Sequence, residues 1–292
     1  MFIKKDQRKI EEILMDSPEQ LEQLNLPKRA SEFKGSLKVL CREGNVKKLS
    51  ALKVLNLYEN DLVDLKGIGM LSQTPIEELS LGYNSISEIP KEFGKLESLK
   101  SIWFDDNNID IFPICLCSLI NLESLRLTGN QLIAIPPAIS ALCNLKTLAI
   151  DNNNLTEFPT GCLQLASLEH LWLRQNKIKA VPDNIDNLQQ LKTLSLSSNS
   201  LVELPASVNG MHSLVNVYLN GNEIRYISED ICLLPNLKQL NLSNNLLNKV
   251  PEEWISLWGE YDAATGKLVQ EGELICAVNM RGNDIPVIAT EN

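Results

Sequence analysis

The sequence is poor in histidine, in aromatic residues and in net positive charge. Its 292 residues include two histidines, aromatic residues make up 5%, and acidic residues outnumber basic ones by 37 to 27. The formal charge of −10 argues against nucleic-acid binding, which needs clustered Lys and Arg, and against attraction to anionic membrane surfaces. Solubility is a sufficient explanation for the acidity itself.

Long apolar runs are also absent. The first nine residues, MFIKKDQRK, contain no apolar run of the kind found in a secretory signal, and no stretch approaches the ~20 apolar residues that span a bilayer. The seven cysteines are an odd number, which favours reduced thiols over a disulfide framework. We therefore expect a cytoplasmic protein that does not insert into membranes.

What the sequence does have is a 23-residue period. Its clearest copy is residues 122–132, LESLRLTGNQL, followed by Ile-Pro at 135–136. A fixed period with L-x-x-L-x-L-x-x-N-x-L spacing predicts a leucine-rich repeat solenoid. Numbering the asparagine as repeat position 9, it recurs at Asn84, Asn107, Asn130, Asn153, Asn176, Asn199, Asn222 and Asn245, with looser copies at Asn60 and Asn283.

The repeat positions predict an α/β solenoid, a horseshoe with a concave parallel β-sheet. Apolar residues at positions 4 and 6 alternate with polar ones, as in a strand with one buried face. The asparagine amide can bond backbone groups of its own and the adjoining turn, so that successive asparagines form a ladder. Proline at position 15 suits an irregular convex side with short helices. Cys162 at the apolar position 18 is interpreted as a small hydrophobic residue.

The two ends depart from the period. Residues 1–50 are predicted to be a helical N-terminal cap and entry repeat, with two short helices before residue 27, Ser17 as an N-cap and Leu21 and Leu24 on an apolar helix face. An independent docking helix is the alternative. Residues 51–255 are the repeats. Residues 256–292 are predicted to be an inserted β-hairpin or ordered loop followed by a C-terminal capping repeat.

The repeat positions also separate the residues that catalysis would need. His170 stands at position 3 on the predicted concave face, whereas His212 stands at position 22 on the convex connection. Cys143 and Cys162 lie in convex segments, so neither forms a Cys–His pair with His170. We therefore predict no enzymatic activity, because the groups do not converge.

Motifs for metals and cofactors are incomplete. The pair Cys115 and Cys117 lacks the spacing and the second ligand pair of a zinc site. The sequence TGKL at 265–268 lacks the glycine spacing and the hydroxyl residue of a phosphate-binding loop. We expect no metal and no cofactor.

The predicted concave face nevertheless carries large side chains at positions 3, 5 and 7. Trp, Tyr and Arg dominate protein-binding hot spots. Three repeats separate the two tryptophans, so at ~4.8 Å per strand they would lie roughly 14–15 Å apart. The alternative is that Trp and Arg merely stack on each other and cover neighbouring strands. The candidate partner-binding residues are Trp103, Asp105, Arg126, Asp151, His170, Trp172, Arg174 and Tyr218.

Over residues 52–255 the unit L-x-x-L-x-L-x-x-N-x-[LI]-x-x-[ILVF]-P resembles the intracellular leucine-rich repeat proteins of the Ras-group type. These include the Ras-pathway scaffold, Ras-suppressor and plant Ras-group-related proteins. The resemblance implies protein–protein recognition in place of catalysis, and a small GTPase or another signalling protein as partner.

Two hypotheses of function follow. The first is a non-catalytic adaptor or scaffold that binds a protein partner on its concave face. The second is an assembly component that self-associates or docks through its ends, by residues 1–26 or 251–275. Light scattering separates them, because a monomer at all concentrations excludes self-assembly.

Overall fold

The computed structural model describes residues 7–16, 18–258, 260–262, 265–269 and 277–285. The chain forms two compact units, Met1–Asn153 and Asn154–Asn292, which are described in turn. The predicted N-cap Ser17 lies outside the described residues, as do Cys276, Pro286 and part of the segment that interrupts the last repeats.

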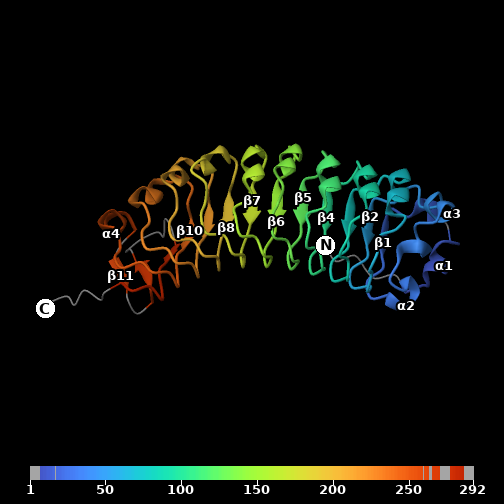
Figure 1. Ribbon diagram of the computed structural model, residues 1–292, viewed down its shortest axis with the longest axis horizontal. Coiled ribbons are helices and arrows are strands. Elements are labelled where there is room, and N and C mark those ends of the chain that lie inside the picture. Colours follow the sequence, from blue (N-terminus) through green and yellow to red (C-terminus); the bar gives the residue numbers. More distant parts are fainter. Residues whose placement is uncertain (1–6, 17, 259, 263–264, 270–276, 286–292) are drawn as a thin grey trace. The chain divides into compact units, whose positions relative to one another are not determined.

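The first unit contains six strands in one parallel sheet, in the order β1-β2-β3-β4-β5-β6. Short helices connect them (Figure 1). The elements are α1 (Ile10–Ile13), η1 (Pro18–Gln20), β1 (Gln23–Asn25), α2 (Ala30–Phe33), η2 (Leu37–Val39), α3 (Glu43–Val46), β2 (Val54–Asn56), η3 (Ile68–Gln73), β3 (Glu78–Ser80), η4 (Lys91–Lys95), β4 (Ser101–Trp103), η5 (Ile114–Ser118), β5 (Ser124–Arg126), η6 (Pro137–Ala141) and β6 (Thr147–Ala149).

The second unit continues the same pattern and ends in an antiparallel hairpin. Its strands follow the order β7-β8-β9-β10-β13-β12-β11, in which β7 to β10 and β13 are parallel and β11 pairs antiparallel with β12. The elements are η7 (Thr160–Gln164), β7 (His170–Trp172), η8 (Ile185–Asn187), β8 (Thr193–Ser195), η9 (Ala206–Gly210), β9 (Asn216–Tyr218), η10 (Glu229–Leu233), β10 (Gln239–Asn241), α4 (Glu252–Trp258), β11 (Glu260–Asp262), β12 (Lys267–Val269) and β13 (Ala277–Asn279).

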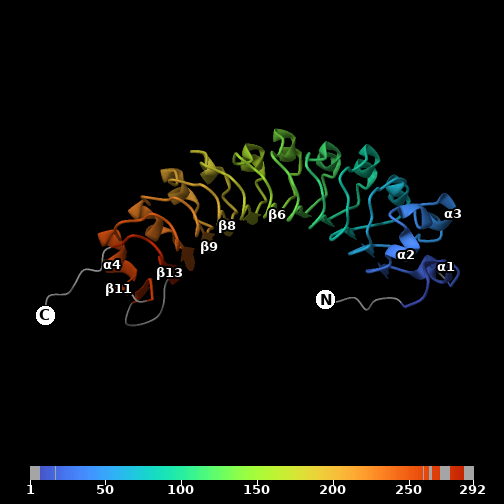
Figure 2. The same cartoon turned by 60° about the horizontal axis from the view of Figure 1, so that its bottom comes forward.

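In each unit the strands lie on one side and most of the 3₁₀ helices on the other (Figures 1 and 2). Like positions pair with like across neighbouring strands, as where Leu125 lies between Ile102 and Leu148. These three side chains are fully buried. The predicted solenoid, with a parallel sheet on one side and short helices on the other, is therefore confirmed.

The position 9 asparagines form the predicted ladder. The Asn130 side chain is 6% exposed. Its Nδ2 donates to the carbonyls of Phe104 and Leu127 at 2.9 and 3.1 Å, and its Oδ1 accepts from the Ile109 amide at 3.0 Å. Because Phe104 and Ile109 belong to the preceding repeat, each asparagine joins two repeats through buried backbone groups that would otherwise lack partners.

Position 8, just before the asparagine, has a positive φ in ten repeats of the described part of the chain. The sequence pattern does not predict this, because the residue type there varies from glycine to tyrosine and glutamate. A single αL residue after each strand turns the chain sharply and lets the asparagine point inward. The residues are Glu59, Tyr83, Asp106, Gly129, Asn152, Gln175, Ser198, Gly221, Asn244 and Gly282, with φ from 52 to 74°.

The first repeat departs from the sequence expectation. The sequence pattern predicts a helix at Leu24, but this residue lies in strand β1, where it pairs with Leu55 of β2. Pairing with the sheet edge outweighs the weak helical preference of three residues. Arg29 occupies the ladder position of this repeat, and its Nη1 donates to the Arg8 carbonyl at 2.6 Å and to Glu32 at 2.7 Å. This buried arginine ties the N-terminal segment to the repeats.

Candidate functional site

We define the strand face as the side chains at positions 3, 5 and 7 of each repeat. In β4, β7 and β9 the middle residue is buried and the flanking residues are half-buried. Alternation along a strand sends the middle side chain to the core and its neighbours to the opposite face. The strand face is therefore the surface that the sheet presents to solvent in each unit.

In the second unit the structure brings Trp172 and Tyr218 together. Their ring centroids are 6.3 Å apart and the ring planes differ by 19°, a stacked pair. Trp172 lies on β7 and Tyr218 on β9. Ser195 of the intervening strand β8 pairs with both of them in the sheet register. Ser195 is 3% exposed, so the two rings cover it. The Tyr218 hydroxyl donates to Gln239 Oε1 at 2.7 Å, which orients the phenol ring.

His170 and Arg174 accompany this aromatic pair. His170 is half-buried at the other end of the β7 triplet, where its register partner is Thr193 of β8. Arg174 is exposed two residues after β7. The second unit therefore holds four of the eight candidate residues, of which Trp172 and Tyr218 are in ring contact.

The first unit holds the other four. Trp103 and Arg126 are register partners on β4 and β5. Arg126 Nε donates to Asp105 Oδ2 at 2.8 Å, and Asp105 Oδ1 also accepts from the Thr128 amide at 3.2 Å. The Arg126 side chain of this ion pair is exposed, so the pair contributes little to stability. The pair does hold the Arg126 guanidinium in place beside the half-buried indole of Trp103.

Asp151, the last candidate in the first unit, is half-buried. Its carbonyl accepts from the Gly129 amide at 2.9 Å. Trp103 and Trp172 belong to different units, so the expected spacing between the two tryptophans stays a prediction.

The repeat positions did not predict a second aromatic pair, Tyr58 with Tyr83. Their centroids are 4.8 Å apart with a tilt of 45°. Gly82 lies beside the pair, where a Cβ would make ordinary van der Waals contact with the Tyr58 ring at 3.5 Å and a tighter contact with the Asp105 carbonyl at 3.2 Å. The Asp106 carboxylate accepts a hydrogen bond from the Tyr83 hydroxyl and raises the pKa of that phenol. The sequence feature that could have predicted this pair is an aromatic residue at position 7 of one repeat and at position 8 of the next.

Among the described residues, no group of three or more His, Cys, Asp or Glu side chains is placed to hold a metal ion. Burial raises the pKa of the Cys41 and Cys162 thiols to about 12. Cys162 is fully buried, which confirms its interpretation as a small hydrophobic residue.

These thiols should differ sharply in reactivity. With iodoacetamide at pH 8, Cys143 is expected to be alkylated first because it is exposed, while Cys41 and Cys162 resist. The thiolate reacts, and a raised pKa leaves less of it at that pH. Peptide mass spectrometry over a time course measures the rates, and unfolding in urea should equalise them. Alkylation of Cys162 at the rate of Cys143 in the folded protein would contradict its burial.

Within the described parts of the chain, no helix has both the length and the apolar character needed to cross a membrane. The architecture defines the chain as a repeat solenoid with an exposed sheet face. A family model described as leucine rich repeat matches residues 74–132, 143–201 and 190–247, and a two-copy repeat model matches residues 120–161. These matches cover more than half of the chain. The chain belongs to the leucine-rich repeat family.

Several solved structures share the fold. A leucine-rich repeat protein of Leptospira interrogans is 28% identical with a TM-score of 0.79, and the alignment covers 98% of this chain and 78% of that one. The ectodomain of the Arabidopsis thaliana receptor kinase GASSHO1/SCHENGEN3 is 26% identical with a TM-score of 0.68, over 90% of this chain but only 30% of the receptor chain.

An internalin of Listeria monocytogenes is 18% identical with a TM-score of 0.62, covering 86% of this chain and 92% of that one, and shows likeness of fold alone. No curated protein matches this chain closely enough to count as a relative. Leucine-rich repeat proteins generally mediate protein–protein interaction and are generally non-catalytic, and this is the class to which the fold and family assign the chain.

Proposed function

We propose that this protein is a non-catalytic adaptor that binds a protein partner on its strand face. The observation that carries the proposal is the stacked Trp172–Tyr218 pair, which stands on the exposed side of the sheet in the second unit. Large aromatic side chains on a solvated sheet cost solubility, and they are among the residues that dominate binding hot spots.

The chemistry of the strand face suits a partner with both apolar and charged groups. The aromatic pair supplies a flat apolar platform, with His170 on the same strand and Arg174 beyond its end. In the first unit Trp103 lies beside the Arg126–Asp105 ion pair, so both signs of charge are present. Mixed charge favours a folded protein or peptide over a polyanion.

Two further points support the proposal. The GASSHO1/SCHENGEN3 ectodomain, which shares the fold, was solved in complex with CASPARIAN STRIP INTEGRITY FACTOR 2. The repeat unit resembles that of the intracellular Ras-group proteins, and on this resemblance we place the protein in the cytoplasm as a signalling scaffold. A small GTPase is the partner class that the resemblance favours.

The test compares wild type with the double variant Trp172→Ala/Tyr218→Ala. Partners are captured from the native cell, identified by mass spectrometry, purified and titrated against each protein. We expect the dissociation constant to rise about tenfold to a hundredfold in the variant, since loss of a hot-spot aromatic commonly costs ~2 kcal/mol or more. The single variant Trp103→Ala tests the strand face of the first unit in the same way.

The matched control is Tyr226→Ala/Leu233→Ala. These side chains are 57% and 65% exposed in the same unit but lie outside the strand positions. Their removal should leave the affinity within about twofold, since scattered surface residues contribute little. Equal affinities for all three equally folded proteins would rule out the strand face. Light scattering on each protein shows whether the captured partner is instead a second copy of the chain.

A further inference from the structure

Positive charge is concentrated in one segment near the N-terminus of the chain. Residues 27–50 contain seven Lys or Arg and two Glu, a net charge of +5 in a chain whose total is −10, so the other residues together carry −15. These 24 residues fold into the N-terminal cap around α2, η2 and α3. A cationic element thus stands at one end of an otherwise acidic protein.

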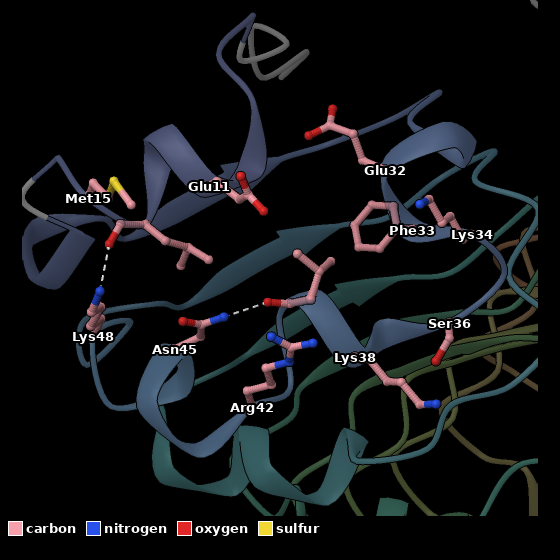
Figure 3. A pocket seen from close by; sticks show the side chains of 12 residues that line it. Glu11, Met15, Glu32, Phe33, Lys34, Ser36, Lys38, Arg42, Asn45 and Lys48 are labelled. Carbon is pink, nitrogen blue, oxygen red and sulfur yellow. Dashed lines mark hydrogen bonds between the residues drawn. The ribbon is translucent and has the colours of Figure 1, made fainter.

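An open groove of about 690 Å³ lies within this cap (Figure 3). Ligand clefts commonly measure about 300–1,000 Å³. Its apolar surface comes mainly from the half-buried Val39 and from Met15, which is 82% exposed, while Leu14 and Phe33 are nearly buried behind them. We call this the cap groove.

Hydrogen bonds between different elements fix the walls of the cap groove. Asn45 Nδ2 donates to the Val39 carbonyl at 2.6 Å, and Lys48 Nζ donates to the Leu14 carbonyl at 3.2 Å (Figure 3). The first bond joins α3 to η2, and the second joins the end of α3 to the segment after α1. A ligand would therefore meet a largely preformed surface, which lowers the entropic cost of binding.

Three cations of the cap groove lack counterions among the residues that the structure describes. Lys34, Lys38 and Arg42 make no ion pair with any residue in the described part of the chain. Glu32 does not neutralise them, because it accepts from Arg29 at 2.7 Å and from the Ile10 amide at 2.8 Å. Figure 3 places Lys38 and Arg42 on the wall opposite Glu11.

Four lysines of the repeats do have counterions. From Glu22 to Lys192, glutamate and lysine alternate at position 2, so that each of these lysines meets a glutamate of the preceding strand segment. These pairs are Lys53–Glu22, Lys100–Glu77, Lys146–Glu123 and Lys192–Glu169, at 2.6 to 3.0 Å. These four lysines are neutralised by neighbouring glutamates, whereas Lys34, Lys38 and Arg42 of the cap groove have no such partner among the described residues.

We propose that the cap groove binds an acidic peptide segment of a partner protein. Carboxylates of the peptide pair with Lys34, Lys38 and Arg42, and an apolar side chain of the peptide packs on Val39 and Met15. The exposed thioether of Met15 adapts to that side chain, as methionine does at other binding surfaces. This site is separate from the strand face and does not depend on its function.

The experiment uses the full chain and a fluorescein-labelled peptide, EDELEEDLEE, with QNQLQQNLQQ as the neutral counterpart. Fluorescence anisotropy at low salt should show binding of the acidic peptide only. The charge-reversal variant Lys34→Glu/Lys38→Glu/Arg42→Glu should weaken binding tenfold or more, and added salt should weaken wild-type binding because exposed charges are screened.

The control variant, Lys66→Glu/Lys91→Glu/Lys95→Glu, makes the same change of net charge. These lysines are exposed in the same unit but lie outside the cap groove. It should bind the peptide within about twofold of wild type. Equal losses in the two variants would overturn the proposal, because bulk charge would then explain binding.

Two other results would also overturn it. One is equal binding of the acidic and neutral peptides. The other is loss, in the cap-groove variant, of binding to phosphatidylserine vesicles but not to the peptide, which would identify a lipid surface as the occupant. Trp172→Ala/Tyr218→Ala should bind the acidic peptide like wild type. The experiments can therefore reject the proposal for the cap groove without rejecting the proposal for the strand face, and the reverse.

Discussion

Replacing Asn107 with alanine is expected to lower the free energy of unfolding of the first unit by about 2–5 kcal/mol, since each buried group left unpaired costs ~1–3 kcal/mol. The side chain is 6% exposed. Its Oδ1 accepts from the Ile86 amide at 3.0 Å, and its Nδ2 donates to the Leu81 and Phe104 carbonyls at 3.0 and 3.1 Å. Alanine removes these bonds, and a weaker one to the Asp105 carbonyl at 3.3 Å, and leaves backbone groups of two repeats without partners.

Urea unfolding measures the loss, and hydrogen exchange locates it. The adjacent Asn108 is exposed, so Asn108→Ala should change stability by less than about 0.5 kcal/mol. Asn107→Asp should be at least as harmful as alanine, because a carboxylate would face the Leu81 and Phe104 carbonyls without donors. If Asn107→Ala and Asn108→Ala unfold alike, the ladder does not hold the repeats together.

Replacing Trp254 with alanine is expected to destabilise the second unit by about 3–5 kcal/mol, the usual cost of truncating a buried tryptophan. The side chain is fully buried, and its Nε1 donates to the Glu229 carbonyl at 3.0 Å. It therefore packs α4 against η10 and closes the core where the regular repeats end. Increased hydrogen exchange in β9 and β10 would report the opening.

The neighbouring Ile255, which is 39% exposed, provides the matched control. Ile255→Ala should cost less than about 1 kcal/mol, since little area leaves contact with the core. Trp254→Phe should fall between the two, because it keeps an aromatic ring but leaves the Glu229 carbonyl unbonded. Equal stabilities of Trp254→Ala and Ile255→Ala would show that the tryptophan does not support the end of the core.

The period of the sequence predicted the repeats because each repeat position has one physical task. An apolar residue at position 4 has only the core to face, as Leu125 and Leu171 do. The asparagine at position 9 has both donors and an acceptor, and Asn130 uses both in bonds to the preceding repeat. These tasks are local and recur every 23 residues, so one copy is enough to infer the rest.

Features that break the period could not be predicted in this way. Strand β1 is three residues long and has Arg29 where the other repeats have asparagine, so only its pairing with β2 identifies it. The positive φ at position 8 follows from the geometry of the turn and not from residue type, since Tyr83 and Gly129 both adopt it.

The sequence by itself determined that this protein is a leucine-rich repeat solenoid and which side chains stand on its strand face, because both follow from a register that every repeat obeys. Only the tertiary structure decided which of those side chains meet. Trp172 reaches Tyr218 because Ser195 between them is small, and Arg126 pairs with Asp105 because their strands are neighbours. The cap groove likewise depends on contacts between helices and connecting segments. These contacts do not recur with the 23-residue period, so the sequence pattern could not predict them.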